Sequence, residues 1–203
     1  MEQQEVNKET GQVTKPWRPP VLVVMVGLPG TGKSHLARRL ASRLPFKLIE
    51  TDEIRHSIAS PPTYSREESG RVYQIAHRQI DRTLRKGGNV IFDATNLYER
   101  GRRTLRKIAE RNNARLLIVH TTAPEKVIED RLRWRKLGVE PQDKSEAGWD
   151  VYCRMREDME VIKQPHLVVD TSQELEPIIE EIVDFVLEKS ESPPDLQLPR
   201  RTT

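Results

Sequence analysis

Eight residues, Gly-Leu-Pro-Gly-Thr-Gly-Lys-Ser at positions 27–34, constrain the fold of this chain more than any other stretch. They follow six consecutive apolar residues, Val21–Val26, and precede an amphipathic stretch from Lys33 to Leu44. A short unbroken apolar run is typical of a strand that is buried on both faces. In a glycine-rich loop between such a strand and a helix, backbone N–H groups can surround a phosphate group, and the helix N-terminus adds a positive dipole. The pattern therefore predicts a phosphate-binding loop.

Short apolar runs alternate with longer amphipathic stretches along the rest of the chain, which is the pattern of a parallel sheet with crossover helices. We predict an α/β fold of the P-loop NTPase type, with a five-stranded parallel sheet flanked by helices and covered by a helical lid. The predicted strands are Val21–Val26, Phe46–Glu50, Asn89–Phe92, Arg115–His120 and His166–Val169. The predicted helices are Lys33–Leu44, Glu67–Lys86, Glu99–Arg111, Pro124–Leu137, Ser145–Ile162 and Glu174–Lys189.

The length of 203 residues suits one domain, which we place at residues 21–189 between a flexible N-terminal segment (1–20) and a disordered tail (190–203). The single cysteine, Cys153, excludes an internal disulfide or a cysteine-based metal site. No secretory signal and no apolar run of membrane-spanning length are found, so we expect a cytoplasmic protein.

The loop has the residue types that bind ATP with Mg²⁺. Lys33 is expected to contact the β- and γ-phosphate oxygens, and the Ser34 hydroxyl to bind Mg²⁺ together with Asp93 at the end of the third predicted strand. The expected nucleotide contacts are Gly27, Leu28, Pro29, Gly30, Thr31, Gly32, Lys33, Ser34 and His35.

The identity of the residue after Asp93 helps to distinguish P-loop proteins that transfer a phosphoryl group from those that hydrolyse nucleotides. P-loop proteins that hydrolyse nucleotides commonly place a glutamate there to handle the attacking water, whereas this chain has Ala94. We therefore expect a kinase that transfers the γ-phosphoryl group to an acceptor hydroxyl. A nucleotide-dependent switch or binding protein without an acceptor is the less favoured alternative.

A kinase needs a carboxylate that accepts the hydroxyl proton. Asp52 follows the second predicted strand, at the sheet edge where open α/β sheets bind ligands, and Arg55 comes one helical turn later. Asp52 is the predicted base and Arg55 a predicted catalytic and acceptor-binding residue. The alternative role for Asp52 is that of a helix N-cap.

Residues 124–163 are predicted to form the lid, two helices joined by a polar connector. Arg131 and Arg135 are four residues apart and share one helix face, from which both can reach the phosphates. The alternative is a basic helix face exposed to solvent.

The motifs Gly-x-Pro-Gly-x-Gly-Lys-Ser, Asp52-x-x-Arg55 and Asp93-x-Thr-Asn96, followed by an arginine-bearing lid, resemble the kinase domain of polynucleotide 5′-hydroxyl kinases and the wider group of small ATP-dependent kinases. The resemblance implies that Asp52 is the general base, that Arg55 and Asn96 contact the acceptor, and that Arg131 or Arg135 contacts the transferring phosphate.

Arg100 and Arg103 follow the Asp93–Asn96 motif, where they can contact the phosphates of an acceptor. A nucleic-acid 5′ end is the acceptor that we expect from the resemblance. A nucleoside, a sugar or an antibiotic is the alternative, because such small molecules suit the same arginines.

Overall fold

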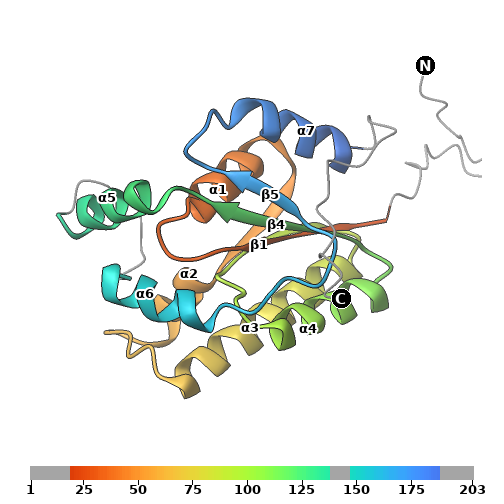
Figure 1. Cartoon of the computed structure of the whole chain (residues 1–203). Helices are drawn as coiled ribbons and strands as arrows, with labels where there is room; N and C mark the ends of the chain where they lie inside the picture. Colours follow the sequence, from red (N-terminus) through yellow and green to blue (C-terminus); the bar gives the residue numbers. More distant parts are fainter. Residues whose placement is uncertain (1–18, 138–146, 188–203) are drawn as a thin grey trace, which may run out of the picture.

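The strand predicted over Val21–Val26 lies at the centre of a parallel sheet (Figure 1). The computed structural model describes residues 19–137 and 147–187, and five strands in this part of the chain pair in the order β2-β3-β1-β4-β5. The strands are β1 (Val21–Val26), β2 (Phe46–Glu50), β3 (Asn89–Asp93), β4 (Arg115–Thr122) and β5 (Leu167–Asp170). All of them run in one direction, so their carboxyl ends meet at the same edge of the sheet. The predicted fold class is confirmed.

Seven helices lie in the same described ranges, and two layers of them cover the sheet. α1 and α7 lie on one face, and α3 and α4 lie on the other (Figure 1). The helices are α1 (Lys33–Arg43), α2 (Thr51–Ile58), α3 (Arg66–Arg85), α4 (Glu99–Arg111), α5 (Glu125–Lys136), α6 (Trp149–Asp158) and α7 (Glu176–Val186).

The burial of β1 explains its unbroken apolar sequence. Leu22, Val24 and Val26 pack on the α3–α4 side, whereas Val21, Val23 and Met25 pack on the α1–α7 side. Each of these side chains is at most 3% exposed. Because a fully buried aliphatic side chain contributes about 1.5–3 kcal/mol, β1 is a major source of stability directly beside the phosphate loop.

Several predicted boundaries differ from the structure, and α2 is not among the six predicted helices. The helix expected to reach Ile162 ends at Asp158, because Met159 is extended and the following carbonyls of Glu160 and Val161 accept hydrogen bonds from Arg102. The last strand is shifted by one residue from the prediction. α7 begins two residues later than predicted, with Pro177 in its first turn.

Some predicted segments lie outside the described residues. They are most of the N-terminal segment, the tail 190–203, residues 138–146 of the expected lid, and the end of the last predicted helix. Within the described ranges, no helix combines the length and apolar character that crossing a membrane requires.

Candidate functional site

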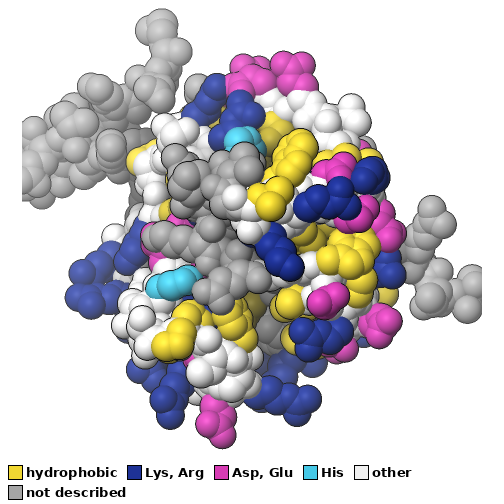
Figure 2. Space-filling model, turned by 90° about the vertical axis from the view of Figure 1, so that its left-hand side faces the viewer, with side chains coloured by type: hydrophobic (Ala, Val, Ile, Leu, Met, Phe, Trp, Pro, Cys, Tyr) yellow, Lys and Arg dark blue, Asp and Glu magenta, His cyan; other side chains and the backbone are white. Residues whose placement is uncertain are grey.

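A cavity of about 2010 Å³ opens at the carboxyl edge of the sheet. Ligand pockets for single small molecules usually occupy roughly 300–1,000 Å³, so this cavity has room for two ligands side by side. Its lining comes from the phosphate loop, from the residues that follow β2 and β3, from α3 and from the α5–α6 helix pair. Figure 2 views the molecule from this end, where Lys and Arg side chains are prominent around the edge of the face.

The phosphate loop has the conformation that its glycines allow. Gly30 and Gly32 have φ angles of +79° and +78°, a region that other residues rarely adopt. A Cβ atom on Gly30 would lie 2.9 Å from Ile128 Cγ2 of α5, so this glycine also lets the helix pair pack closely on the loop. Gly32 is the N-cap of α1, whose first residue is Lys33. Backbone N–H groups at this helix start are suited to an anion.

Part of the predicted nucleotide-binding segment faces the protein interior. Thr31 donates to the Leu28 carbonyl and hydrogen-bonds Thr121 at 2.8 Å, while Leu28 packs against α5 and α6 residues. Gly27, Leu28 and Thr31 do not line the cavity; Pro29, Gly30, Gly32, Lys33, Ser34 and His35 do.

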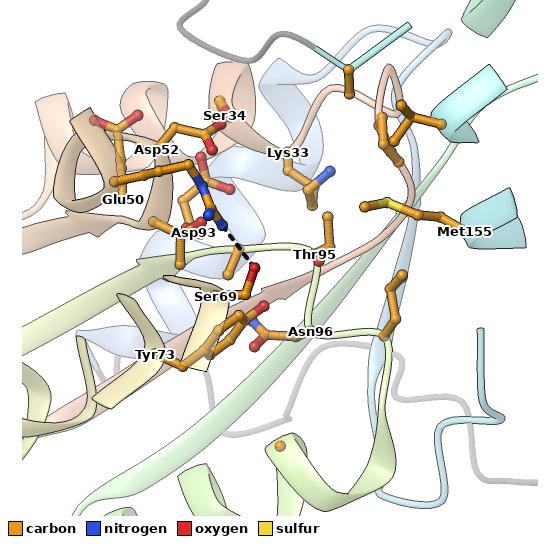
Figure 3. Close-up of a pocket in the computed structure, with 18 of the residues that line it drawn as sticks. Lys33, Ser34, Glu50, Asp52, Ser69, Tyr73, Asp93, Thr95, Asn96 and Met155 are labelled. Atoms are coloured by element: carbon orange, nitrogen blue, oxygen red, sulfur yellow. Dashed lines mark hydrogen bonds between the residues drawn. The ribbon is translucent and has the colours of Figure 1, made fainter. Parts of the chain in front are cut away.

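Ser34 and Asp93 both line the cavity, and Figure 3 shows them with Lys33 and Asp52. Asp93 is 5% exposed. Burial raises its pKa to about 6, although the charge of Lys33 and a hydrogen bond with Ser34 oppose this rise. A desolvated carboxylate is stabilised by a cation, so this pair of oxygen ligands fits Mg²⁺.

Asp52 lies in the first turn of α2, which follows β2 without a connecting residue. The N-cap of α2 is Glu50, so Asp52 is not the N-cap considered as its alternative role. Glu50 is paired with Arg38 at 2.8 Å. Asp52 lines the cavity and is close enough to Asp93 to raise the pKa of that carboxyl group.

Arg55 lines the cavity but is 6% exposed and is held by other residues. Its guanidinium donates to Glu68 and to Ser69, and it stacks over the Tyr64 ring at 4.6 Å. Hydrogen bonds from Thr63 are the main reason why the pKa of Glu68 is lowered to about 2. The structure therefore places Arg55 in a buried ion pair at the wall of the site.

Asn96 and Arg100 of the predicted acceptor side line the cavity, whereas Arg103 does not. Asn96 adopts a left-handed conformation, with φ of 49°, and its Nδ2 donates to the Met25 carbonyl at 2.7 Å. The exposed Arg103 lies elsewhere on the surface of α4. In Figure 3, Asn96 and Tyr73 lie on the opposite side of the site from Ser34, with Ser69 and Thr95 between them.

Both predicted lid arginines line the cavity. Arg131 donates to the Gly30 carbonyl at 3.2 Å, to the Thr171 hydroxyl at 2.8 Å and to the Thr171 carbonyl at 2.8 Å. α5 is thus attached by a cation to the phosphate loop. Met155 of α6 extends into the same space (Figure 3).

Three residues that support the site were not predicted. Glu68 holds Arg55, and Thr171 joins Arg131 to the Thr31 carbonyl. Arg102, which is 1% exposed, donates to the carbonyls of Asn96, Leu97, Glu160 and Val161 and so attaches the loop after β3 to the end of α6. The capping pattern Ser65-x-x-Glu68 was a sequence signal that could have drawn attention to Glu68. No sequence pattern indicated the roles of Arg102 and Thr171.

A protein-family model described as an AAA domain matches residues 22–162. The match covers more than half of the 203-residue chain, so the protein belongs to this family. Uncharacterized proteins of Mycobacterium tuberculosis and Mycobacterium bovis are 30% identical in an alignment of 123 residues that covers 55% of this chain. The chain spans only 25% of the length of those relatives.

Solved structures share the fold at low sequence identity. The APS kinase of Mycobacterium tuberculosis with AMPPNP and APS has a TM-score of 0.61 at 18% identity, covering 84% of this chain and 98% of that one. A gluconokinase from Sinorhizobium meliloti 1021 has a TM-score of 0.60 at 19% identity, covering 86% and 95%. Kti12 from Chaetomium thermophilum with ADP-AlF3 has a TM-score of 0.63 at 16% identity, covering 82% and 97%.

Proposed function

We propose that this protein is an ATP-dependent phosphotransferase that phosphorylates a hydroxyl group of a small molecule. The observation that carries this proposal is one continuous cavity that joins the phosphate loop to Asp52 and has room for a nucleotide and a second ligand. A protein that only binds or hydrolyses a nucleotide has no need of the second volume.

The donor half of the reaction rests on Lys33, Ser34 and Asp93. Lys33 donates to the Leu28 carbonyl across the loop at 2.8 Å, and we assign its ammonium group to the phosphate oxygens of the nucleotide. Mg²⁺, held by Ser34 and Asp93, would neutralise charge on the phosphates. Within residues 19–137 and 147–187, no three His, Cys, Asp or Glu side chains are grouped to bind a metal by themselves. Phosphate oxygens and water would therefore complete the coordination of Mg²⁺.

The acceptor half rests on Asp52. We assign it to take the proton of the acceptor hydroxyl as the oxygen–phosphorus bond forms. Lys33, with Arg131 or Arg135, would stabilise charge on the transferring group. Because Arg55 is committed to Glu68, we propose that it shapes the wall beside Asp52.

Two features favour transfer to a hydroxyl over hydrolysis. Ala94 follows Asp93 and is 4% exposed, so the side chain at this position offers no carboxylate to orient water. The α5–α6 pair packs on the phosphate loop through Ile128 and Leu132, and we propose that it acts as the lid that excludes water.

We favour a small molecule over a polynucleotide 5′ end. The solved neighbours with this fold include proteins named APS kinase and gluconokinase, both named after small acceptors. The motif resemblance to polynucleotide kinases leaves a nucleic-acid acceptor as the second candidate, and acceptor assays separate the two.

The test is the Asp52→Asn variant, with Asp184→Asn on the exposed surface of α7 as its matched control. Loss of a general base is expected to lower kcat roughly 10²- to 10⁴-fold, while the affinity for Mg·ATP stays unchanged. Phosphorylation of the acceptor by Asp52→Asn at the parent rate would contradict the assignment of the base.

A further inference from the structure

Two arginines of the cavity wall have no partner in the structure described. Arg66, in the first turn of α3, and Arg100, in the first turn of α4, both line the cavity and are exposed. Within residues 19–137 and 147–187, neither guanidinium makes a hydrogen bond or an ion pair. Other lining arginines are engaged, for example Arg38 with Glu50 and Arg131 with Thr171.

A bound anion would offset one unfavourable feature of the position of these two arginines. The N-terminus of a helix carries a partial positive charge, so a cation in the first turn is repelled by it. The acidic residues of the same turns are Glu67, Glu68 and Glu99, and within residues 19–137 and 147–187 none of them forms an ion pair with Arg66 or Arg100. Glu68 accepts from Arg55 and Thr63, and Glu99 accepts from Arg102 and Gln164.

The two arginines both line the cavity, each from the first turn of its helix. The charge of Arg66 on α3 acts on Tyr98, only two residues before Arg100, and opposes the rise in the pKa of Tyr98 that burial and Asp158 cause. The Tyr98 ring is 52% exposed and also lines the cavity.

Acidic residues of this region are also engaged. Asp158 accepts from the Tyr98 hydroxyl at 3.4 Å, and a Glu160 carboxylate oxygen accepts from the Glu99 backbone N–H at 2.6 Å. Neither forms an ion pair with Arg66 or Arg100 in the ranges that the structure covers. The positive charge of the two arginines is therefore available to a ligand.

We propose that the acceptor is an anionic small molecule, which carries a phosphate monoester or a carboxylate in addition to its reacting hydroxyl. Arg66 and Arg100 bind the anionic group, and the hydroxyl faces Asp52. Guanidinium groups suit both anions because they form paired hydrogen bonds with them. This inference rests on the proposed function and adds the chemical class of the acceptor to it.

With such an acceptor, every bond and proton of the transfer reaction is accounted for. The acceptor oxygen forms a bond to the γ-phosphorus of ATP, the bond between that phosphorus and the bridging oxygen breaks, and ADP leaves. Asp52 takes the hydroxyl proton. The anionic group does not react, so Arg66 and Arg100 affect binding of the acceptor more than the rate of the bound complex.

The test compares the double variant Arg66→Gln/Arg100→Gln with the double control Arg82→Gln/Lys107→Gln. The control removes two exposed charges from the same two helices, α3 and α4, outside the cavity lining. ADP release is measured with matched acceptor pairs: polyols, sugars and nucleosides, each with its phosphate monoester or its acid. A 5′-hydroxyl oligonucleotide forms a separate arm.

We expect the anionic member of a pair to have the higher kcat/KM. Loss of charge-assisted hydrogen bonds should raise its KM about tenfold to hundredfold in the cavity variant, with little change in kcat and none in the KM for ATP. The control variant should match the parent. Equal use of neutral and anionic members, or use of the oligonucleotide alone, would overturn the inference.

A binding measurement separates this inference from the proposed function. Inorganic phosphate is titrated by calorimetry into the protein saturated with Mg·ADP, and again into both double variants. Weaker phosphate binding only in the cavity variant supports the anion site, and equal binding in all three proteins rejects it. If the anion site is present but no hydroxyl compound is ever phosphorylated, the proposed function fails instead.

Discussion

Replacing Asp93 by asparagine should stabilise the protein while removing a proposed Mg²⁺ ligand. Asp93 is 5% exposed, and burial is the main cause that raises its pKa from an ordinary value of 3.8 to about 6. The native protein therefore pays a free-energy cost to ionise this carboxyl group. Asparagine has nearly the same shape and carries no charge, so the variant avoids that cost.

The magnitude follows from the two pKa values. A difference between 3.8 and about 6 corresponds to about 3 kcal/mol at 1.36 kcal/mol per pH unit. Below pH 4 the group is protonated in both the native and the unfolded state, and the two proteins should be equally stable. Between pH 4 and pH 6 the unfolded chain loses its proton first, so the parent loses stability relative to the variant. Above pH 6 the difference is constant.

The assay is thermal and urea unfolding of the parent and of Asp93→Asn, without nucleotide, from pH 4 to pH 8. At pH 8 the variant should unfold about 6–12 °C higher, because about 1 kcal/mol shifts the Tm of a chain of this size by about 2–4 °C. Asp81→Asn is the control, because the pKa of Asp81 is lowered and its substitution should therefore change stability in the opposite direction. A hydrogen bond from Asn112 is the main cause of the lowered pKa of Asp81, so its variant should lose stability at neutral pH.

A pH-independent difference, or no difference at pH 8, would show that Asp93 is not held ionised at a cost. The same variant should gain less stability from Mg·ATP than the parent does, because the proposed cation would lose one carboxylate ligand. Equal stabilisation of both proteins by Mg·ATP would contradict the role of Asp93 at Mg²⁺.

Two further substitutions test the architecture of the site. Gly30→Ala should destabilise the protein by about 1–3 kcal/mol in urea unfolding, because the φ of Gly30 is left-handed and because the new Cβ would meet Ile128. Gly101→Ala is the control: its new Cβ would have no atom within 4 Å, so this variant should be neutral or stabilising. Arg102→Met should lower stability by about 3 kcal/mol or more, because four backbone carbonyls lose a buried donor; the exposed neighbour Arg103→Met should change it by less than about 0.5 kcal/mol. An unchanged Tm for Arg102→Met would refute its role in attaching the loop after β3 to the end of α6.

The sheet and the phosphate loop were predictable because their residue types are dictated locally. β1 is covered on both faces, which requires an apolar residue at every position, and the loop needs Gly30 and Gly32 where the backbone is left-handed. Asp52 and Asp93 could be placed at one edge because they follow parallel strands.

The partners of the arginines could not be predicted in this way. Arg102 and Arg103 are adjacent in a basic helix, yet one is 1% exposed and the other lies on the surface. The difference depends on carbonyl groups 58 and 59 residues further along the chain. Likewise, the commitment of Arg55 to Glu68 depends on how α2 packs against α3. The spacing of residues within one helix cannot predict contacts with such distant segments.

The destination of the γ-phosphoryl group tests the central claim most directly. Phosphorus NMR of a reaction containing the protein, Mg·ATP and an anionic hydroxyl acceptor should show the γ-phosphorus signal replaced by a new phosphate ester, formed in equal amount with ADP. The Asp52→Asn variant should form neither product at a comparable rate. Conversion of the γ-phosphoryl group to inorganic phosphate alone, with every acceptor unchanged, would contradict the claim that this cavity transfers a phosphoryl group to a hydroxyl.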